Sequence, residues 1–211
     1  MKRILLLVTV ALMLAAAMAL SGVAQARPIA DSADAKCAKL AIKTLGPSFN
    51  PSNYTIIGGT EDDDNFTSQA TDGPDVFCGF GERDQIDTLA EGDIFLGGAG
   101  DDFVLENHGT VYGQEGDDDV FENFGTVYGG AGNDEVFLNQ DGATFYGGDS
   151  NDQVVLENNG TFYGDAGDDR VTINLDTFYG GAGDDFVEKN FGTFYGGPGN
   201  DSVGAGLLPV D

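Results

Sequence analysis

The sequence predicts an all-β fold: a right-handed parallel β-roll (a β-solenoid) with coils of 16–18 residues and a short N-terminal cap. Three observations predict it. The chain repeats itself at this period from about residue 79 onward, which is typical of solenoids. Glycine- and aspartate-rich turns alternate with short runs of valine, phenylalanine and tyrosine, which favour strands. Within each run, inward and outward side chains alternate with the period of a strand.

The first residues indicate export rather than fold. Lys2 and Arg3 precede an uncharged apolar run over residues 4–20, and the small-x-small site Ala24-Gln25-Ala26 follows. This pattern is typical of a secretory signal peptide cut after Ala26, and an uncleaved membrane anchor is the alternative. We therefore expect a secreted, extracellular protein with no membrane span after cleavage. The expected parts are a signal peptide over 1–26, a capping segment over 27–56, the β-roll over 57–204 and a tail over 205–211.

The charge of the chain limits its partners. The whole chain has a formal net charge of −27, and the mature part reaches −29 because the signal peptide holds two basic residues and no acid. Such a charge repels the phosphates of nucleic acids and anionic membranes, so neither is an expected partner. It also destabilises any compact state through self-repulsion unless cations neutralise it.

Each repeat divides into four parts. A six-residue turn, GGxGxD, is followed by three strand residues such as Phe103-Val104-Leu105, then by a shorter turn such as Glu106-Asn107-His108-Gly109, and then by a second strand such as Thr110-Val111-Tyr112. Two turns and two strands make one coil, and coils stack at about 4.8 Å. The units cover 97–112, 113–128, 129–146, 147–163, 164–179 and 180–195, and a seventh begins at 196.

The period of two places the middle residue of each strand inside. In the first strand of each coil these residues are Ile86, Val104, Val120, Val136, Val154, Val171, Val187 and Val203. In the second strand they are Phe95, Val111, Val127, Phe145, Phe162, Phe178 and Phe194. We expect a thin apolar core between two parallel sheets, and we expect the 17- and 18-residue units to shift the register locally.

Aspartates mark the two edges of the roll. Asp75, Asp84, Asp93 and Asp102 are nine residues apart, which is half a coil, so they alternate between the edges. From Asp102 the long-turn column continues through the later repeats, whereas the opposite edge changes to ENxG-type turns. The sequence thus predicts one metal-rich edge and one largely metal-free edge. Residues 56–64, IIGGTEDDD, look like a degenerate first turn.

The nine-residue pattern GGxGxDxUx, with U apolar, resembles the repeat of the RTX, or haemolysin-type, calcium-binding β-roll, over about residues 71–204. The resemblance implies calcium held by turn carbonyls and by the position-six aspartates. On the long-turn edge these are Asp84, Asp102, Asp118, Asp134, Asp152, Asp169, Asp185 and Asp201, with Asp75 and Asp93 on the other edge. Eight stacked turns leave up to seven gaps for ions. Turns with Glu82-Arg83, Gln114-Glu115 and Asp149-Ser150 depart from the pattern, which weakens the sites expected there.

Elementary chemistry supports this reading. Glycines permit positive φ, so that backbone carbonyls can face a cation, and aspartate supplies a hard oxygen. Calcium takes six to eight oxygens, which one turn cannot supply but two stacked turns can. Without calcium the stacked carboxylates repel one another, so folding is expected to depend on calcium.

Two cysteines, Cys37 and Cys78, are predicted to form a disulfide in an exported chain, with two free thiols as the alternative. Cys78 occupies the position that tyrosine holds in later coils, so it should point outward. The N-terminal segment, with a possible short helix over Asp34 to Thr44, would then fold over that face and cap the roll.

Outward rows define a possible interaction face, made of Thr110, Tyr112, Thr126, Tyr128, Thr144, Tyr146, Thr161, Tyr163, Thr177, Tyr179, Thr193 and Tyr195. Its rows serve packing and solubility, or bind a cell-surface glycan or protein, or, as the least favoured option, ice. Asparagines at the short turns are interpreted as a ladder of amides: Asn107, Asn123, Asn139, Asn158 or Asn159, Asn174 and Asn190.

No catalytic pattern is found in the sequence. His108 is the single histidine and lies in a turn, and no Ser/His/Asp, HExxH or Cys/His arrangement exists. The expected function is a secreted, non-catalytic, calcium-binding repeat protein with a structural or interaction role. The alternatives are a calcium-dependent adhesive module that uses the threonine and tyrosine rows, and a fragment that serves an enzyme.

Overall fold

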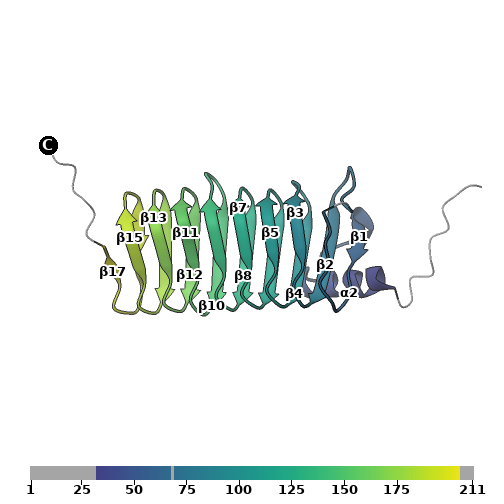
Figure 1. Ribbon diagram of the computed structural model, residues 1–211, viewed down its shortest axis with the longest axis horizontal. Helices are drawn as coiled ribbons and strands as arrows, with labels where there is room; N and C mark the ends of the chain where they lie inside the picture. Colours follow the sequence, from purple (N-terminus) through teal and green to yellow (C-terminus); the bar gives the residue numbers. More distant parts are fainter. Residues whose placement is uncertain (1–31, 68, 205–211) are drawn as a thin grey trace, which may run out of the picture. The chain divides into compact units, whose positions relative to one another are not determined.

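The structure, a computed structural model, describes residues 32–67 and 69–204 (Figure 1). The expected signal peptide and C-terminal tail lie outside the described residues. The described chain is a parallel β-solenoid of two sheets, with strands that alternate between them coil by coil. The predicted all-β fold and the coil length are therefore confirmed.

One sheet, here called sheet A, has nine strands in the order β1-β2-β4-β6-β8-β10-β12-β14-β16. Its strands are β1 (Thr55–Gly58), β2 (Asp75–Gly81), β4 (Ile94–Ala99), β6 (Thr110–Glu115), β8 (Thr126–Ala131), β10 (Thr144–Asp149), β12 (Thr161–Ala166), β14 (Thr177–Ala182) and β16 (Thr193–Tyr195). The facing sheet B has eight strands in the order β17-β15-β13-β11-β9-β7-β5-β3. These are β3 (Gln85–Leu89), β5 (Phe103–Asn107), β7 (Asp119–Asn123), β9 (Glu135–Asn139), β11 (Gln153–Asn158), β13 (Arg170–Asn174), β15 (Phe186–Asn190) and β17 (Ser202–Val203).

Except for β16 and β17 at the C-terminal end, the strands are longer than the three residues that the repeat suggests. Each pairs in parallel with the equivalent strand of the next coil, so that Val104 lies beside Val120. The backbone ladder also runs into the turns, where Gln114 pairs with Gly130 and Asn107 with Asn123. Turn residues continue the strand because identical turns stack as regularly as strands do. The predicted boundary at residue 57 falls inside β1, and the division into domains stays a prediction.

The core consists of the two predicted inward columns. The valines of sheet B from Val104 to Val187 are at most 2% exposed, and they face the Phe and Val column of sheet A. Rings of successive coils stack, with centroids 4.7 Å apart for Phe145 and Phe162. At the last described coil Val203 is 48% exposed, since no further described coil covers it. At the other end Phe66 belongs to the core and packs against Phe77 of β2, with ring centroids 5.6 Å apart.

The longer units do not disturb sheet A. Thr144 of the 18-residue unit lies beside Thr161 of the next, and the same register holds along the whole sheet. The additional residue of the 17-residue unit is absorbed in sheet B, by a register shift between Val154 and Glu157. The extra residues of the 18-residue unit lie in the short turn over 140–143, between β9 and β10. The expected local shift is therefore wrong for sheet A, because sheet B and a turn take up the extra residues.

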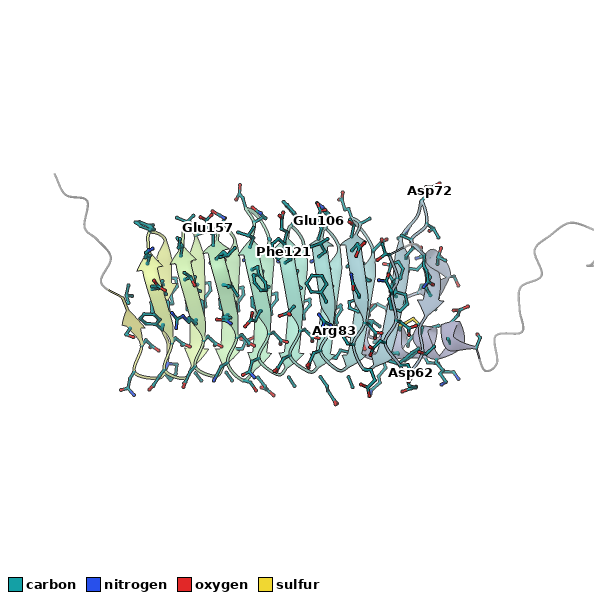
Figure 2. All side chains as sticks on the ribbon, viewed as in Figure 1. Asp62, Asp72, Arg83, Glu106, Phe121 and Glu157 are labelled. Atoms are coloured by element: carbon teal, nitrogen blue, oxygen red, sulfur yellow. A yellow bond between two sulfur atoms is a disulfide. The ribbon has the colours of Figure 1, made fainter. Side chains whose placement is uncertain are left out.

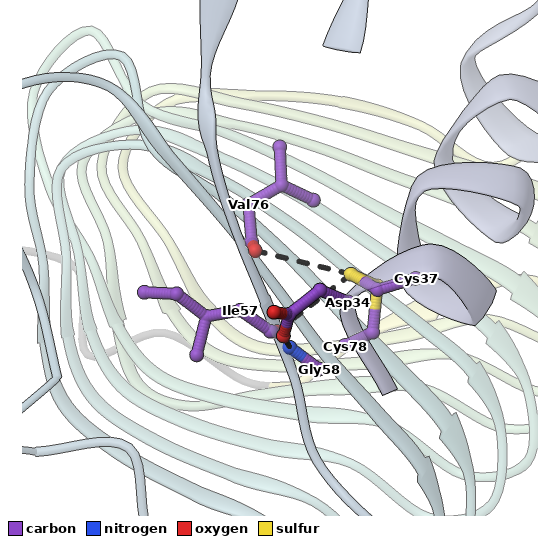
Figure 3. The surroundings of a disulfide bond; sticks show 6 residues. All are labelled: Asp34, Cys37, Ile57, Gly58, Val76 and Cys78. Atoms are coloured by element: carbon purple, nitrogen blue, oxygen red, sulfur yellow. Dashed lines mark hydrogen bonds between the residues drawn. A yellow bond between two sulfur atoms is a disulfide. The ribbon is translucent and has the colours of Figure 1, made fainter. Parts of the chain in front are cut away.

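An N-terminal helix, α2 (Ala33–Leu45), covers the outer face of the first strands of sheet A, and the short 3-10 helix η1 (Pro51–Asn53) follows it. Cys37 and Cys78 form the predicted disulfide between α2 and β2, with Cα atoms 5.5 Å apart (Figure 3). Asp34 accepts the backbone N–H of Gly58 at 3.1 Å, which satisfies a donor on β1. Within the described ranges, no helix has the length and apolar character needed to cross a bilayer.

Candidate metal centre

A column of aspartates runs along the long-turn edge. Each carboxylate accepts, through Oδ1, the backbone N–H of the aspartate one coil earlier, as Asp118 does from Asp102 at 2.9 Å. The same bond recurs at 2.8–3.1 Å along the edge. The column contains Asp64, Asp84, Asp102, Asp118, Asp134, Asp152, Asp169, Asp185 and Asp201. All eight aspartates expected on this edge thus stand in one row, and their role as ligands stays a prediction.

The second carboxylate oxygen has no partner in most of these residues. Oδ2 is buried and accepts no hydrogen bond in Asp84, Asp102, Asp118, Asp134, Asp152, Asp169 and Asp185. A buried carboxylate oxygen without a donor costs free energy, so native proteins rarely leave one unsatisfied. Seven such atoms in one row indicate a shared missing partner, and that partner has to be positive or a donor.

The first glycine of each turn makes room for this oxygen. A Cβ on Gly97 would lie 1.9 Å from Asp102 Oδ2 and 2.8 Å from the carbonyl oxygen of Gly113. Gly113 and Gly164 stand in the same relation to the next aspartates and carbonyls. When the carboxyl is ionised, its Oδ2 and a carbonyl oxygen of the following coil therefore face one point, and both oxygens only accept hydrogen bonds. This is an arrangement that a cation stabilises.

Burial shifts the titration of these carboxyls upward. Loss of water raises the pKa of Asp118 to about 9 and that of Asp152 to about 8. For Asp84, Asp102, Asp134 and Asp169 burial raises the pKa to about 7. Neighbouring carboxylates add to the increase, and the N–H from the adjacent coil opposes it. At neutral pH burial therefore opposes ionisation of these carboxyls, and a nearby cation would favour it.

The residues present fit calcium. Carboxylate and carbonyl oxygens are the hard ligands that calcium takes, and they come here from adjacent coils. Across residues 32–67 and 69–204, no three carboxylate, histidine or cysteine side chains form a ready-made metal cluster. Backbone carbonyls would thus have to supply part of the six to eight oxygens.

Asp64 belongs to this column and was missed as a candidate. Its N–H donates to Asp84 Oδ1 at 2.8 Å, as in every later coil, and its own Oδ2 accepts from the Thr60 hydroxyl at 3.1 Å. The signal was present in the degenerate turn over 56–64. An insertion separates Asp64 from Asp84 by 20 residues, so the spacing hid it.

The opposite edge differs in its chemistry. Asp75 accepts from the Thr71 hydroxyl at 2.7 Å, and its own N–H donates to Asp93 Oδ1 at 2.9 Å. The other oxygen of Asp93 accepts from Ala90 N–H at 3.3 Å. Protein donors thus engage both carboxylates, unlike those of the long column. Their assignment as calcium ligands stays a prediction that this geometry does not favour.

Beyond Asp93 the same edge is held by an amide ladder. Asn107 Nδ2 donates to Asn123 Oδ1 at 2.8 Å and to the carbonyl of Thr126 at 3.2 Å. The ladder continues through Asn139, Asn158, Asn174 and Asn190. The sequence left Asn158 and Asn159 open, and the structure places Asn158 in the ladder. Neutral amides satisfy one another, so this edge requires no ion.

A second ladder runs beside the aspartate column. The position-five side chain of one coil accepts the position-five N–H of the next, as Asp117 does from Asn133 at 2.7 Å. Its direction is opposite to that of the position-six column, in which the later coil accepts. These exposed Asp and Asn residues thus brace the turns, as their turn preference suggests.

Turns in which another residue replaces glycine keep the same backbone path, but the replacing residue adopts a strained φ. Five non-glycine residues have left-handed φ, between 60° and 88°: Phe80, Glu82, Gln114, Ser150 and Asp165. In regular turns glycine occupies these positions, such as Gly98 with φ 120°. The backbone therefore follows the same path at a conformational cost.

The threonine and tyrosine rows stand outward on sheet A as predicted. Successive tyrosine rings from Tyr112 to Tyr195 stack with centroids 4.8–4.9 Å apart and planes within 8°. The ring faces therefore cover one another, and the row presents ring edges and hydroxyls. At its N-terminal end Tyr112 packs against the cluster beneath α2.

Comparison with protein families gives one match. A family model described as the RTX calcium-binding nonapeptide repeat matches four copies, over residues 79–105, 126–142 and 175–188. These segments contain Asp84, Asp102, Asp134 and Asp185 of the column. No match was found among curated proteins or among solved structures.

Proposed function

We propose that this chain, an RTX β-roll repeat protein with calcium-binding repeats, is a secreted and non-catalytic protein that folds when it binds calcium and acts outside the cell as a structural or interaction element. The observation that carries the proposal is the row of buried, unpartnered Oδ2 atoms on the long-turn edge. Ions in the gaps of this column, up to seven between Asp84 and Asp201, would give these oxygens their partner.

Coupling of folding to calcium follows from the same row. The apolar core is only two side chains thick, whereas each coil adds a buried carboxylate at one edge. The ionised carboxylates repel one another and so oppose the stacking of coils. A cation between two coils would attract the carboxylates on either side of it and so favour stacking. Calcium therefore contributes directly to the free energy of folding.

The non-catalytic part of the proposal rests on how the polar groups are used. The buried aspartates of the long-turn column and the buried asparagines from Asn107 onward belong to hydrogen-bonded ladders, and Asp75 and Asp93 bond to each other and to neighbouring turn groups. His108 stacks on Phe124 at 4.6 Å and contacts Glu106 at 2.8 Å, which gives it a local partner in its turn. Secretion rests on the pattern of residues 1–26 and is supported by the disulfide, which favours an oxidising compartment.

A calcium titration of matched variants tests the proposal. Circular dichroism at pH 7.5 should show β-structure gained with calcium, and calorimetry should count several ions per chain. Asp134→Asn should lower the calcium response, because it replaces an unpartnered Oδ2 by an amide. The control Asp141→Asn changes an exposed aspartate of the opposite edge and should respond as the parent does. A full β spectrum after calcium removal at pH 7.5 would refute coupled folding.

A calcium-dependent adhesive module is the second candidate, and the unbroken register of the threonine and tyrosine rows favours it. Because the ring faces are stacked, a glycan or protein would meet hydroxyls and ring edges rather than an open aromatic platform. Replacement of Thr144 and Tyr146 by alanine in mid-array tests it. Lost binding with intact calcium-induced folding supports this function, and unchanged binding contradicts it.

A further inference from the structure

Sheet B carries a row of apolar side chains on its outer face. Leu105 is 42% exposed and Phe121 is 37% exposed, on the neighbouring strands β5 and β7. Phe137 of β9 continues the row, with its ring centroid 5.4 Å from that of Phe121. Outward aromatic residues on adjacent strands form a contiguous patch, which is a feature typical of an interaction site. No described segment covers this patch.

Acidic residues border the row on both sides. Toward the short turns Glu106 lies beside Glu122, one position beyond the apolar side chains. Figure 2 shows Glu106 nearer to the short turns than Phe121 is. Toward the long turns Asp119 lies beside Glu135.

A shallow hollow opens at the long-turn side of the row. It is lined by Arg83, Asp101, Asp117, Asp119, Asn133 and Glu135. Arg83 is the one basic residue in this lining, against four acids. From Asp84 to Asp169 the sequence has no lysine or arginine and 21 aspartates and glutamates. The patch therefore carries an excess of negative charge, which attracts cationic groups.

We propose that this face of β5, β7 and β9 is a docking surface for a cationic polypeptide segment in which basic and apolar side chains alternate. Apolar side chains of the partner would cover Leu105, Phe121 and Phe137, and its lysines or arginines would reach the flanking acids. The charge argues against a second copy of this chain, because two such acidic faces repel each other. The proposal stands on surface residues and does not depend on the aspartate column.

A synthetic peptide of alternating lysine and leucine is the probe, and a peptide of alternating lysine and serine is its charge-matched control. Binding is measured by fluorescence anisotropy with the full mature chain saturated with calcium. The lysine–leucine peptide should bind at least tenfold more tightly than the control. The double variant Phe121→Ser/Phe137→Ser should remove this difference. The matched variant Leu175→Ser changes a residue that is also 42% exposed but lies outside the row, and it should leave binding unchanged.

Circular dichroism with calcium checks that each variant folds. If the phenylalanine variant loses its structure, Glu122→Gln/Glu135→Gln replaces it and should weaken the lysine–leucine peptide about fivefold, with a smaller dependence on salt. Equal binding of both peptides to the parent chain overturns the proposal, because charge alone would then explain the attraction. Equal weakening by Leu175→Ser overturns it too. Dimerisation of the chain that the phenylalanine variant abolishes would assign the face to a second copy instead.

Discussion

Removal of calcium should make the stability of the roll fall as pH rises. In four residues of the column, Asp102, Asp118, Asp134 and Asp152, the pKa is raised from 3.8 to about 7 or higher, mainly because burial removes water. A carboxyl whose pKa is higher in the folded than in the unfolded state binds more protons when folded. The contribution of such a carboxyl to the free energy of unfolding is therefore fully present below pH 3.8, and it is lost as pH rises through about 7.

The size of the effect follows from four central residues, Asp102, Asp118, Asp134 and Asp152. One pKa unit corresponds to about 1.4 kcal/mol, so each group disfavours folding by about 2 kcal/mol more at pH 7 than at pH 5. Together they account for about 8 kcal/mol, which is comparable with the whole net stability of a typical domain. The calcium-free chain should therefore hold more β-structure at pH 5 than at pH 7.5.

Far-UV circular dichroism measures this directly. Calcium is removed beforehand with a chelating resin, because soluble chelators lose their affinity for calcium in acid. The calcium-loaded chain should show the opposite trend, since protons compete with the metal. Asp118→Asn sharpens the test: without calcium it should stabilise the fold at pH 7 by up to about 4 kcal/mol, and with calcium it should destabilise it. Equal or greater β-structure at pH 7.5 than at pH 5 in the calcium-free chain would refute the reasoning.

Three further predictions concern the frame around the column. Gln114→Gly removes a non-glycine residue with a φ of 88° and also a buried amide oxygen without a partner. The melting temperature with calcium should therefore rise by roughly 2–4 °C. A decrease would show that no strain is stored at this position. Asn123→Ala breaks the amide ladder and should lower the free energy of unfolding by about 2–3 kcal/mol, measured with denaturant. Asn159→Ala changes a residue outside the ladder and should leave the free energy of unfolding nearly unchanged. Equal losses in the two variants would contradict the role of the ladder. Reduction of the Cys37–Cys78 disulfide, which joins residues 41 apart, should cost about 4 kcal/mol, measured by thermal melts with and without reductant; no change would contradict its capping role.

The repeat made most of the fold predictable. A fixed period with alternating apolar residues determines which side chains enter the thin core, and the equivalent positions point inward in each coil. Val136 and Phe162, both predicted inward, are 0% exposed, and the helix expected over 34–44 spans Ala33–Leu45. The disulfide followed from the presence of two cysteines in a chain expected to be exported, and Cys78 lies in register with Leu96 and so with the tyrosine row.

Features outside the period were harder to predict. Asp64 was hidden by the insertion before Asp84, and the register shift between Val154 and Glu157 depends on which sheet can bulge at least cost. The unpartnered Oδ2 atoms could not be read from the sequence, because an aspartate in a turn is usually satisfied by nearby N–H groups, as Asp75 is here. Whether a carboxylate oxygen has a donor depends on three-dimensional packing, and the two edges of the roll differ in this property.

A crystal structure of the mature chain grown with calcium, with calcium located by its anomalous scattering, tests the central claim most directly. Peaks are expected between successive coils on the long-turn edge, within 2.3–2.6 Å of the Oδ2 atoms of the column from Asp84 to Asp201. The amide edge from Asn107 to Asn190 should show none. Peaks confined to exposed acids, or a column that stays protonated and free of metal at pH 7.5, would contradict the account.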